Sequence, residues 1–112
     1  AEWMEKNLPT DVQIGGDYYA PPISEEKFQF VKMPLIGYHN FEWYQENDFS
    51  YLVFTGTEYD RYFEEPEKYP TEINEYKELF SKGVLIKEFK EDKRVEKFLS
   101  PTVRIYKVPK AK

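Results

Sequence analysis

One feature constrains the fold of this chain more than any other: residues 49–54, FSYLVF, are almost uninterruptedly apolar. A strand with one face in water alternates apolar and polar side chains, because successive side chains point to opposite faces. This run keeps apolar side chains on both faces, as in strands that are covered on both sides. It therefore predicts the central strand of a sheet whose two faces are both packed.

The hydrophobic spacing elsewhere predicts further short elements. Strands are expected over residues 12–14, 28–32, 84–89 and 102–108, and helices over 1–8, 40–47, 58–63 and 70–82. Strands separated by helices indicate a partly parallel sheet, whereas the last two strands follow each other directly and favour an antiparallel pair at one edge. The predicted fold is α/β: a small mixed sheet of about five strands with helices on its faces, in a three-layer arrangement.

Residues with special backbone preferences set the predicted ends of these elements. Asn40 suits the N-cap of a helix, and Pro70 suits the first turn of the longest one. Gly83 fits the position just after that helix, and Gly15 with Gly16 is expected to end the first strand. The pattern is that of short elements with abrupt ends.

Length and composition place the chain among single-domain globular proteins. Its 112 residues suit one domain spanning 1–112, and its 19% of aromatic residues are enough for an ordinary core. Charged residues make up 33%, which excludes a protein embedded in hydrocarbon, and no apolar run approaches the roughly 20 residues that span a bilayer. No signal peptide is visible and the chain begins directly in a helical pattern, which predicts a fragment of a longer protein.

The residue types present also exclude several kinds of site. There is no Cys, which excludes disulfides and thiolate metal sites, and one His is too few for a histidine zinc site. We therefore predict no metal and no cofactor. A lone His without a nucleophile beside it is rarely a catalyst, and most acidic residues lie beside lysines in a solvent-exposed pattern, so no catalytic residue is predicted.

Charge is unevenly spread along the chain. Residues 1–84 carry 7 basic and 17 acidic side chains, whereas residues 85–112 carry 9 basic and 4 acidic ones, within a net charge of −5. The acidic body should repel nucleic acid, so no nucleic-acid partner is predicted. The basic end suits an anionic lipid or a phosphate, and the alternative is an ordinary solvated edge.

Two segments after the central strand hold the main candidate ligand-binding residues. Thr55 and Thr57 lie where the strand meets a helix, at the edge of an α/β sheet where ligands usually bind. The following Tyr59-Asp60-Arg61-Tyr62 combines an arginine fork that suits phosphate or carboxylate with a carboxylate and two tyrosines that suit sugars. The alternatives are a plain strand-to-helix turn, and an ion pair of Arg61 with Asp60 or another nearby carboxylate that fastens the end of the helix.

A third candidate is the loop of residues 17–22, DYYAPP. Tyr18 and Tyr19 are candidate ligand-binding residues, because two neighbouring aromatic rings in a loop suit a small recognition surface. The prolines that follow cannot lie inside a helix or a central strand, so the segment is predicted as a loop. The alternative is a loop that packs over the edge of the sheet.

Three stretches together resemble a known family. They are the N-terminal AEWMEKNLP with the later YAPP, the central YLVF, YDRY, PEKYP, YKELF and KEF, and the C-terminal SPTVRIY. In this combination, which covers nearly the whole chain, the sequence resembles the C-terminal soluble segment of prokaryotic membrane proteins similar to dolichyl-phosphate-mannose protein mannosyltransferases. Its most specific parts are YDRY at 59–62 and PTVRIY at 101–106. Members of that family tend to carry Ser-Ser after the central strand, where this chain has Thr55-Gly56-Thr57.

The resemblance implies a soluble domain on the outer face of a membrane. Many transmembrane helices precede such a domain, and they carry the catalytic acidic residues and bind the polyprenyl-phosphate sugar. The resemblance thus predicts a non-catalytic extracytoplasmic accessory domain of a membrane glycosyltransferase that assists acceptor or donor binding. Its implied partners are the transmembrane portion of the same polypeptide and a lipid-linked sugar or a glycan or protein acceptor. The alternative is a stand-alone carbohydrate- or phosphate-binding module.

Overall fold

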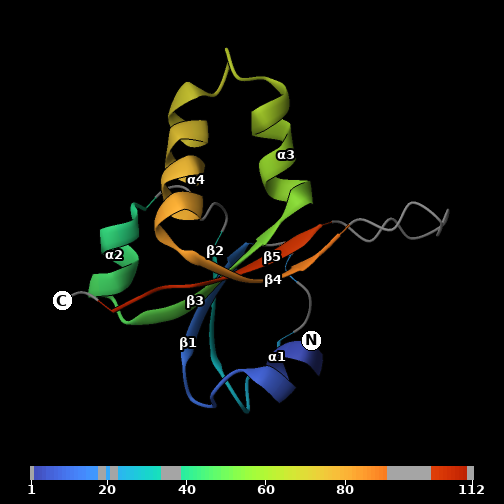
Figure 1. Ribbon diagram of the computed structural model, residues 1–112, viewed down its shortest axis with the longest axis vertical. Coiled ribbons are helices and arrows are strands. Elements are labelled where there is room, and N and C mark those ends of the chain that lie inside the picture. Colours follow the sequence, from blue (N-terminus) through green and yellow to red (C-terminus); the bar gives the residue numbers. More distant parts are fainter. Residues whose placement is uncertain (1, 18–19, 21–22, 34–38, 91–101, 111–112) are drawn as a thin grey trace, which may run out of the picture.

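A computed structural model of the protein (Figure 1) describes residues 2–17, 20, 23–33, 39–90 and 102–110. The helices are α1 Glu2–Asn7, α2 Phe41–Glu46, α3 Gly56–Glu64 and α4 Pro70–Lys82. The strands are β1 Gln13–Asp17, β2 Gln29–Met33, β3 Phe49–Thr55, β4 Val84–Phe89 and β5 Val103–Lys107. Their order along the chain is the one that the hydrophobic spacing predicts, so the predicted α/β class is confirmed.

The five strands form one mixed sheet in the order β2-β1-β3-β5-β4. Strand β1 pairs in parallel with both β2 and β3, whereas β5 pairs in antiparallel fashion with both β3 and β4. The segment predicted as the central strand is therefore the middle strand of the sheet, and the last two strands are antiparallel at one edge, as predicted. Strands that run in the same direction need crossover connections. Helix α2 lies in the crossover from β2 to β3, and helices α3 and α4 lie in the crossover from β3 to β4.

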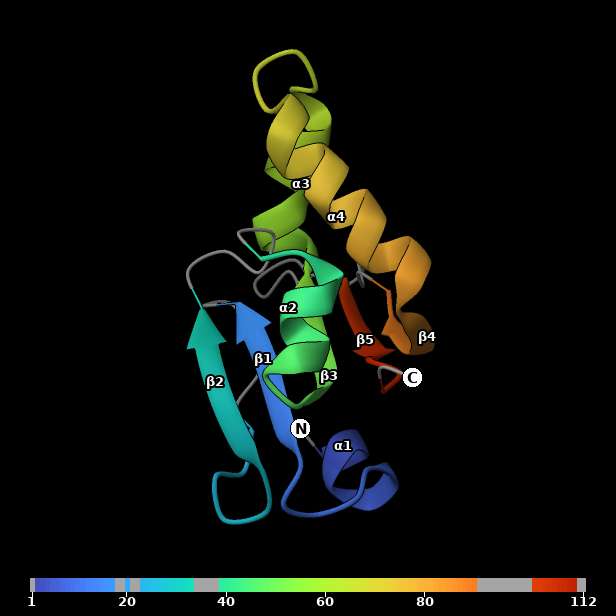
Figure 2. The same ribbon diagram turned by 90° about the vertical axis from the view of Figure 1, so that its left-hand side faces the viewer.

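The two faces of the sheet are covered unequally (Figures 1 and 2). Helices α2, α3 and α4 cover one face, and α3 and α4 form a hairpin that extends beyond the sheet. Short helix α1 lies against the other face, together with side chains of the connection between β1 and β2. The predicted helices on both faces are confirmed, and the layer formed by α1 is the smaller one.

The larger helical layer is held by aromatic side chains. Phe54 of β3 contacts the rings of Tyr76, Phe80 and Tyr106 edge to face, with ring centroids 4.9 to 5.9 Å apart. Such pairs add roughly 0.5–1.5 kcal/mol each beyond the burial of their area. The other face is mostly aliphatic, and its buried residues include Met4, Leu8, Ile14, Val53 and Ile105. Most of the buried aromatic side chains therefore lie on one side of the sheet.

The two glycines of β1 do not end the strand, so the predicted strand end at this point is wrong. Strand β1 continues through Gly15 and Gly16 to Asp17. The reason is close packing: a Cβ on Gly16 would lie 2.7 Å from the ring of Phe30, and one on Gly15 would lie 3.0 Å from the ring of Phe49. Glycine inside a strand often marks such a close approach. The continued strand carries Asp17 to the carboxyl edge of the sheet.

Two further details differ from the predictions. Helix α3 begins at Gly56 directly after β3, two residues before the predicted start, so there is no turn between them. Gly83 ends α4 as predicted, but with extended backbone (φ −76°, ψ 164°) and not the left-handed form of a glycine cap. It lies against Leu79 and Tyr106, where a Cβ would come within 3.0 to 3.2 Å of their atoms.

Part of the chain lies outside this description. The charged connection after β4 falls almost entirely within residues 91–101, and the loop predicted over 17–22 is described only at Asp17, which belongs to β1, and at Ala20. Among the described residues, no helix combines the length and the apolar character needed to cross a membrane.

Candidate functional site

The carboxyl ends of the parallel strands β1 and β3 meet at one edge of the sheet. From β1 the chain passes to β2 on one side, and from β3 it passes through α3 and α4 to β4 on the other side. This reversal of direction makes the gap between the ends of β1 and β3 a topological switch point, where open α/β sheets usually bind their ligands. The candidate ligand-binding residues after the central strand were placed at this edge by the sequence, and the structure puts them there.

A buried carboxylate joins the ends of the two strands. Asp17 ends β1 and is 1% exposed, while Thr55 ends β3 and is fully buried. The backbone N–H of Thr55 donates to Oδ2 of Asp17 at 2.9 Å, and the threonine Oγ1 lies 2.8 Å from both carboxylate oxygens. Hydrogen bonds to an ionised acceptor are roughly twice as strong as neutral ones. This Asp17–Thr55 latch therefore fixes the relative position of β1 and β3 at the switch point.

A second buried carboxylate lies in the first turn of α3. Glu58 is 2% exposed, and its Oε1 accepts from Nη2 of Arg61 at 2.7 Å and from the hydroxyl of Tyr62 at 3.4 Å. A negative charge is favourable near a helix N-terminus. The hydrogen bond to Glu58 is the largest cause that raises the pKa of the Arg61 guanidinium, although 55% of that side chain is exposed. The predicted ion pair of Arg61 thus exists, and its partner is Glu58.

A buried tyrosine hydroxyl completes the polar cluster. Tyr76 of α4 is 1% exposed, and within the described part of the chain its hydroxyl makes no hydrogen bond. Burial raises its pKa, and the negative charges of Glu58 and Asp17 add to this effect. A buried hydroxyl without a partner costs roughly 1–3 kcal/mol. The Tyr76 hydroxyl is therefore a polar group that a bound donor or acceptor would satisfy.

The predicted site residues separate into two groups. Thr55 and Tyr59 are buried and hold the fold together, since Tyr59 packs in the aromatic layer with the guanidinium of Arg104 5.3 Å from its ring. Thr57 and Asp60 are exposed on α3. Arg61 and Tyr62 are the predicted residues that combine accessibility with a place in the polar cluster, because the hydroxyl of Tyr62 accepts from Arg61 at 3.1 Å. Tyr18 and Tyr19 lie outside the described residues, directly after Asp17 in the sequence.

Three members of the cluster were not predicted from the sequence: Asp17, Glu58 and Tyr76. The strand was expected to stop before Asp17, which hid the position of that residue at the end of β1. Glu58 precedes Arg61 by three residues, a spacing that pairs opposite charges on a helix, and this signal was available. Tyr76 shares the apolar face of α4 with Ile73 and Leu79, a spacing that indicates a core position and gives no signal for its hydroxyl.

Taken together, the cluster offers hydrogen-bond acceptors, one exposed guanidinium and aromatic rings. Carboxylates and tyrosines suit the hydroxyls of a polar ligand, and the guanidinium suits a phosphate or carboxylate. Among the described residues, no group of three or more His, Asp or Glu is arranged to hold a metal ion. Comparison of the chain with protein-family models, with curated protein sequences and with solved structures found no match.

Proposed function

We propose that the chain is a non-catalytic accessory domain of a membrane glycosyltransferase that uses polyprenyl-phosphate sugars. In this proposal the domain lies on the extracytoplasmic face, is joined to the transmembrane portion of the same polypeptide, and assists binding of the acceptor or the donor. The proposal rests on the family resemblance of the sequence and on the way the most specific stretches of that resemblance meet in space.

The observation that carries the proposal is the contact between the YDRY and PTVRIY stretches. The guanidinium of Arg104 lies 5.3 Å from the ring of Tyr59. Three residues before Tyr59, the backbone N–H of Gly56 donates to the carbonyl of Thr102 at 2.7 Å. Strand β5 also pairs along β3, with Phe54 opposite Arg104. Two stretches about 40 residues apart in the sequence thus form one unit at the carboxyl edge. This is the behaviour expected of a motif that marks a particular fold.

The state of the two carboxylates supports a binding or positioning role. Asp17 accepts from Thr55, and Glu58 accepts from Arg61 and Tyr62. A general base has to reach the proton of a substrate through an open hydrogen-bonding position. Here both carboxylates are nearly fully buried and are engaged by groups of the protein itself. The exposed Arg61 and the half-buried Tyr62 are the groups that a ligand meets first.

The parent polypeptide provides the direct test of the proposal. An antibody raised against this chain is used on fractionated cells of the source organism. The proposal expects a large band in the membrane fraction, and removal of this domain from that enzyme should impair but not abolish sugar transfer. A small soluble band near the 13.5 kDa of the chain, or sugar transfer by the isolated chain, would contradict it.

The second candidate function is a stand-alone carbohydrate- or phosphate-binding module. The observation that favours it is the Arg61–Tyr62 pair, which presents a planar cation beside an aromatic ring above buried Glu58. NMR titration of the chain with methyl α-mannoside and with mannose 1-phosphate tests it. Shifts confined to residues around Arg61, which disappear in Arg61→Gln and persist in the control Lys77→Gln, would support it. The absence of shifts at millimolar ligand would exclude it for these sugars.

A further inference from the structure

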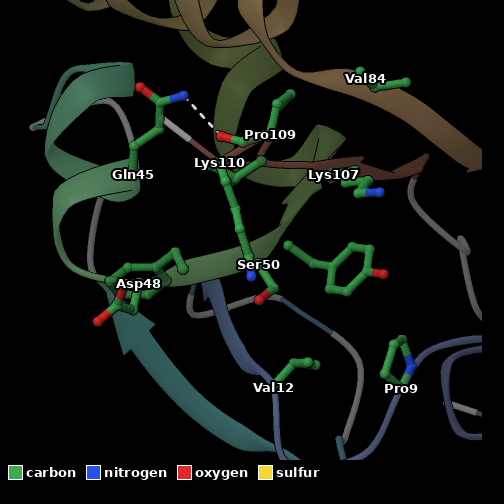
Figure 3. A pocket seen from close by; sticks show the side chains of 12 residues that line it. Pro9, Val12, Gln45, Asp48, Ser50, Val84, Lys107, Pro109 and Lys110 are labelled. Atoms are coloured by element: carbon green, nitrogen blue, oxygen red, sulfur yellow. Dashed lines mark hydrogen bonds between the residues drawn. The ribbon is translucent and has the colours of Figure 1, made fainter. Parts of the chain in front are cut away.

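An open groove lies at the opposite edge of the sheet from the polar cluster. Figure 3 shows it between the amino ends of β1 and β3, the end of β5 and the start of β4. Its volume is about 990 Å³, at the upper end of the range of small-molecule sites. The lining residues used below are Pro9, Val12, Asp48, Ser50, Tyr51, Val84, Lys107 and Lys110.

Much of the groove wall is apolar. Val12, Tyr51 and Val84 contribute from three different strands or their ends, and prolines contribute from both ends of the chain. Val84 is 50% exposed, and its neighbour Leu85 on the same edge strand is 48% exposed. These are two of the large apolar side chains that the structure leaves in solvent. An apolar surface of this kind, bordered by polar residues, is typical of a binding surface.

Two lysines of the groove have no partner within the described part of the chain. The side chains of Lys107 and Lys110 form no hydrogen bond or ion pair there. Basic residues elsewhere do so: Lys82 lies 2.7 Å from Glu42, and Arg104 lies 2.8 Å from Glu88. Other exposed lysines, such as Lys77, also have no partner among the described residues, but Lys107 and Lys110 lie together on the wall of one groove, where their ammonium groups are available to an external anion.

The two ammonium groups lie in different parts of the groove. The side chain of Lys110 runs across the groove toward Ser50, whereas Lys107 lies on the side of Val84 (Figure 3). Strand pairing places Lys107 directly opposite Val84. The acidic member of the lining, Asp48, lies at the far end from Lys107. One part of the groove is therefore cationic and apolar at once.

We propose that this groove binds the phosphate headgroup and the first part of the acyl chains of an anionic phospholipid, so that the amino edge of the sheet faces a bilayer. The lysines attract the anionic headgroups, and the apolar wall with Val84 contacts the hydrocarbon next to them. The inference goes beyond the proposed function, because it identifies which edge of the domain meets the membrane. It rests on the proposed membrane location for its biological meaning, but binding itself is a property of the isolated chain.

Matched soluble lipids give the first test. The isotopically labelled chain is titrated in NMR experiments with dihexanoyl phosphatidylglycerol, with dihexanoyl phosphatidylcholine and with inorganic phosphate. We expect shifts at the amides of Val12, Ser50, Val84 and Lys107 with phosphatidylglycerol, and binding of phosphatidylcholine at least fivefold weaker. Equal binding of the two lipids, equal shifts with phosphate alone, or shifts confined to other surfaces would overturn the proposal.

Matched variants give the second test, by flotation with vesicles of phosphatidylcholine with and without phosphatidylglycerol. The double variant Lys107→Glu and Lys110→Glu should weaken binding to the anionic vesicles by more than about 25-fold, since each lysine near an anionic surface contributes roughly fivefold. The control Lys68→Glu and Lys77→Glu makes the same change of charge away from the groove and should retain most of the binding. Equal loss of binding in both variants would show a general charge effect and would refute lipid binding in the groove.

A third variant separates an amphiphile from a simple anion. Val84→Ser removes an exposed apolar group without a change of charge, and it should weaken vesicle binding severalfold. Unchanged binding in Val84→Ser would contradict the apolar contact. A failure of these lipid tests leaves a large membrane-bound parent possible, and a small soluble band in cell fractions leaves lipid binding possible, so the two proposals fail separately.

Discussion

The two edges of the sheet treat their charged side chains in opposite ways. At the carboxyl edge, Asp17 and Glu58 are almost completely buried and each is bonded to groups of the protein. At the amino edge, Lys107 and Lys110 line an open groove and have no partner among the described residues. The protein thus uses one set of charges internally and leaves the other accessible.

The difference teaches which charges belong to the fold and which are available for binding. A buried charge needs partners, because the free-energy cost of removing it from water is otherwise not offset. An exposed ammonium group needs no protein partner, because water solvates it and a surface ion pair would add little stability. Substitutions at the first edge should therefore change stability, and substitutions at the second should change only binding.

The largest effect is expected at the Asp17–Thr55 latch. Asp17→Asn keeps the shape but replaces a charged acceptor by a neutral amide, so the hydrogen bonds with the backbone N–H and the hydroxyl of Thr55 lose the contribution of the charge. The free energy of unfolding should fall by about 2 kcal/mol, measured by urea denaturation. The control is Asp48→Asn at the other edge, where asparagine tolerates the left-handed backbone (φ 62°). Equal losses of unfolding free energy in the two variants would show that the two edges of the sheet do not differ in this way.

A smaller loss is expected when Glu58 loses its cation. Arg61→Gln removes the 2.7 Å ion pair from a carboxylate that is 2% exposed, but Tyr62 remains as a donor and solvent reaches the arginine side of the pair. These factors reduce the expected loss to about 1 kcal/mol. Thermal unfolding of Arg61→Gln and of the exposed control Lys77→Gln measures it. An Arg61→Gln variant as stable as the control would mean that water replaces the guanidinium at no cost.

The third variant should be neutral or should gain stability. Tyr76→Phe removes a buried hydroxyl that has no partner within the described residues, so the free energy of unfolding should rise by about 0 to 1 kcal/mol. Tyr44 is the matched control, because it is equally buried but its hydroxyl lies 3.5 Å from the sulfur of Met33. Tyr44→Phe should lose stability in the same denaturation experiment. A marked loss in Tyr76→Phe would show that its hydroxyl is bonded in solution.

The smallest effect on stability is expected for the two lysines of the groove. The double variant Lys107→Glu and Lys110→Glu should change the free energy of unfolding by no more than about 0.5 kcal/mol, because neither side chain has a partner to lose. Denaturation at low and at high salt measures this and shows any long-range charge effect. A loss as large as that of Asp17→Asn would place these lysines in the fold and erase the difference between the two edges.

Local signals in the sequence account for the elements and their order. The apolar run 49–54 is the middle strand, Asn40 is the N-cap of α2 and accepts from the N–H of Trp43, and Pro70 begins α4. These signals act over one to four residues, through side-chain periodicity and helix capping. For the same reason the sequence placed Thr55 and the following helix at the carboxyl edge of the sheet.

Contacts between distant residues decided the rest. The hydrogen bonds of Asp17 reach across 38 residues to Thr55, and nothing near Asp17 in the sequence signals them. Gly15 and Gly16 were expected to end a strand, yet the rings of Phe49 and Phe30 need the space that a side chain would fill. A local pattern carries no information on which ring will lie above a given backbone position.

By itself the sequence determined the α/β class, the middle strand and the order of the helices and strands. The tertiary structure alone decided which charges are buried in pairs at one edge and which remain unpaired in a groove at the other. The physical reason is that hydrophobic periodicity and capping depend on neighbours along the chain. The burial and pairing of a charge depend on whatever the fold brings beside it.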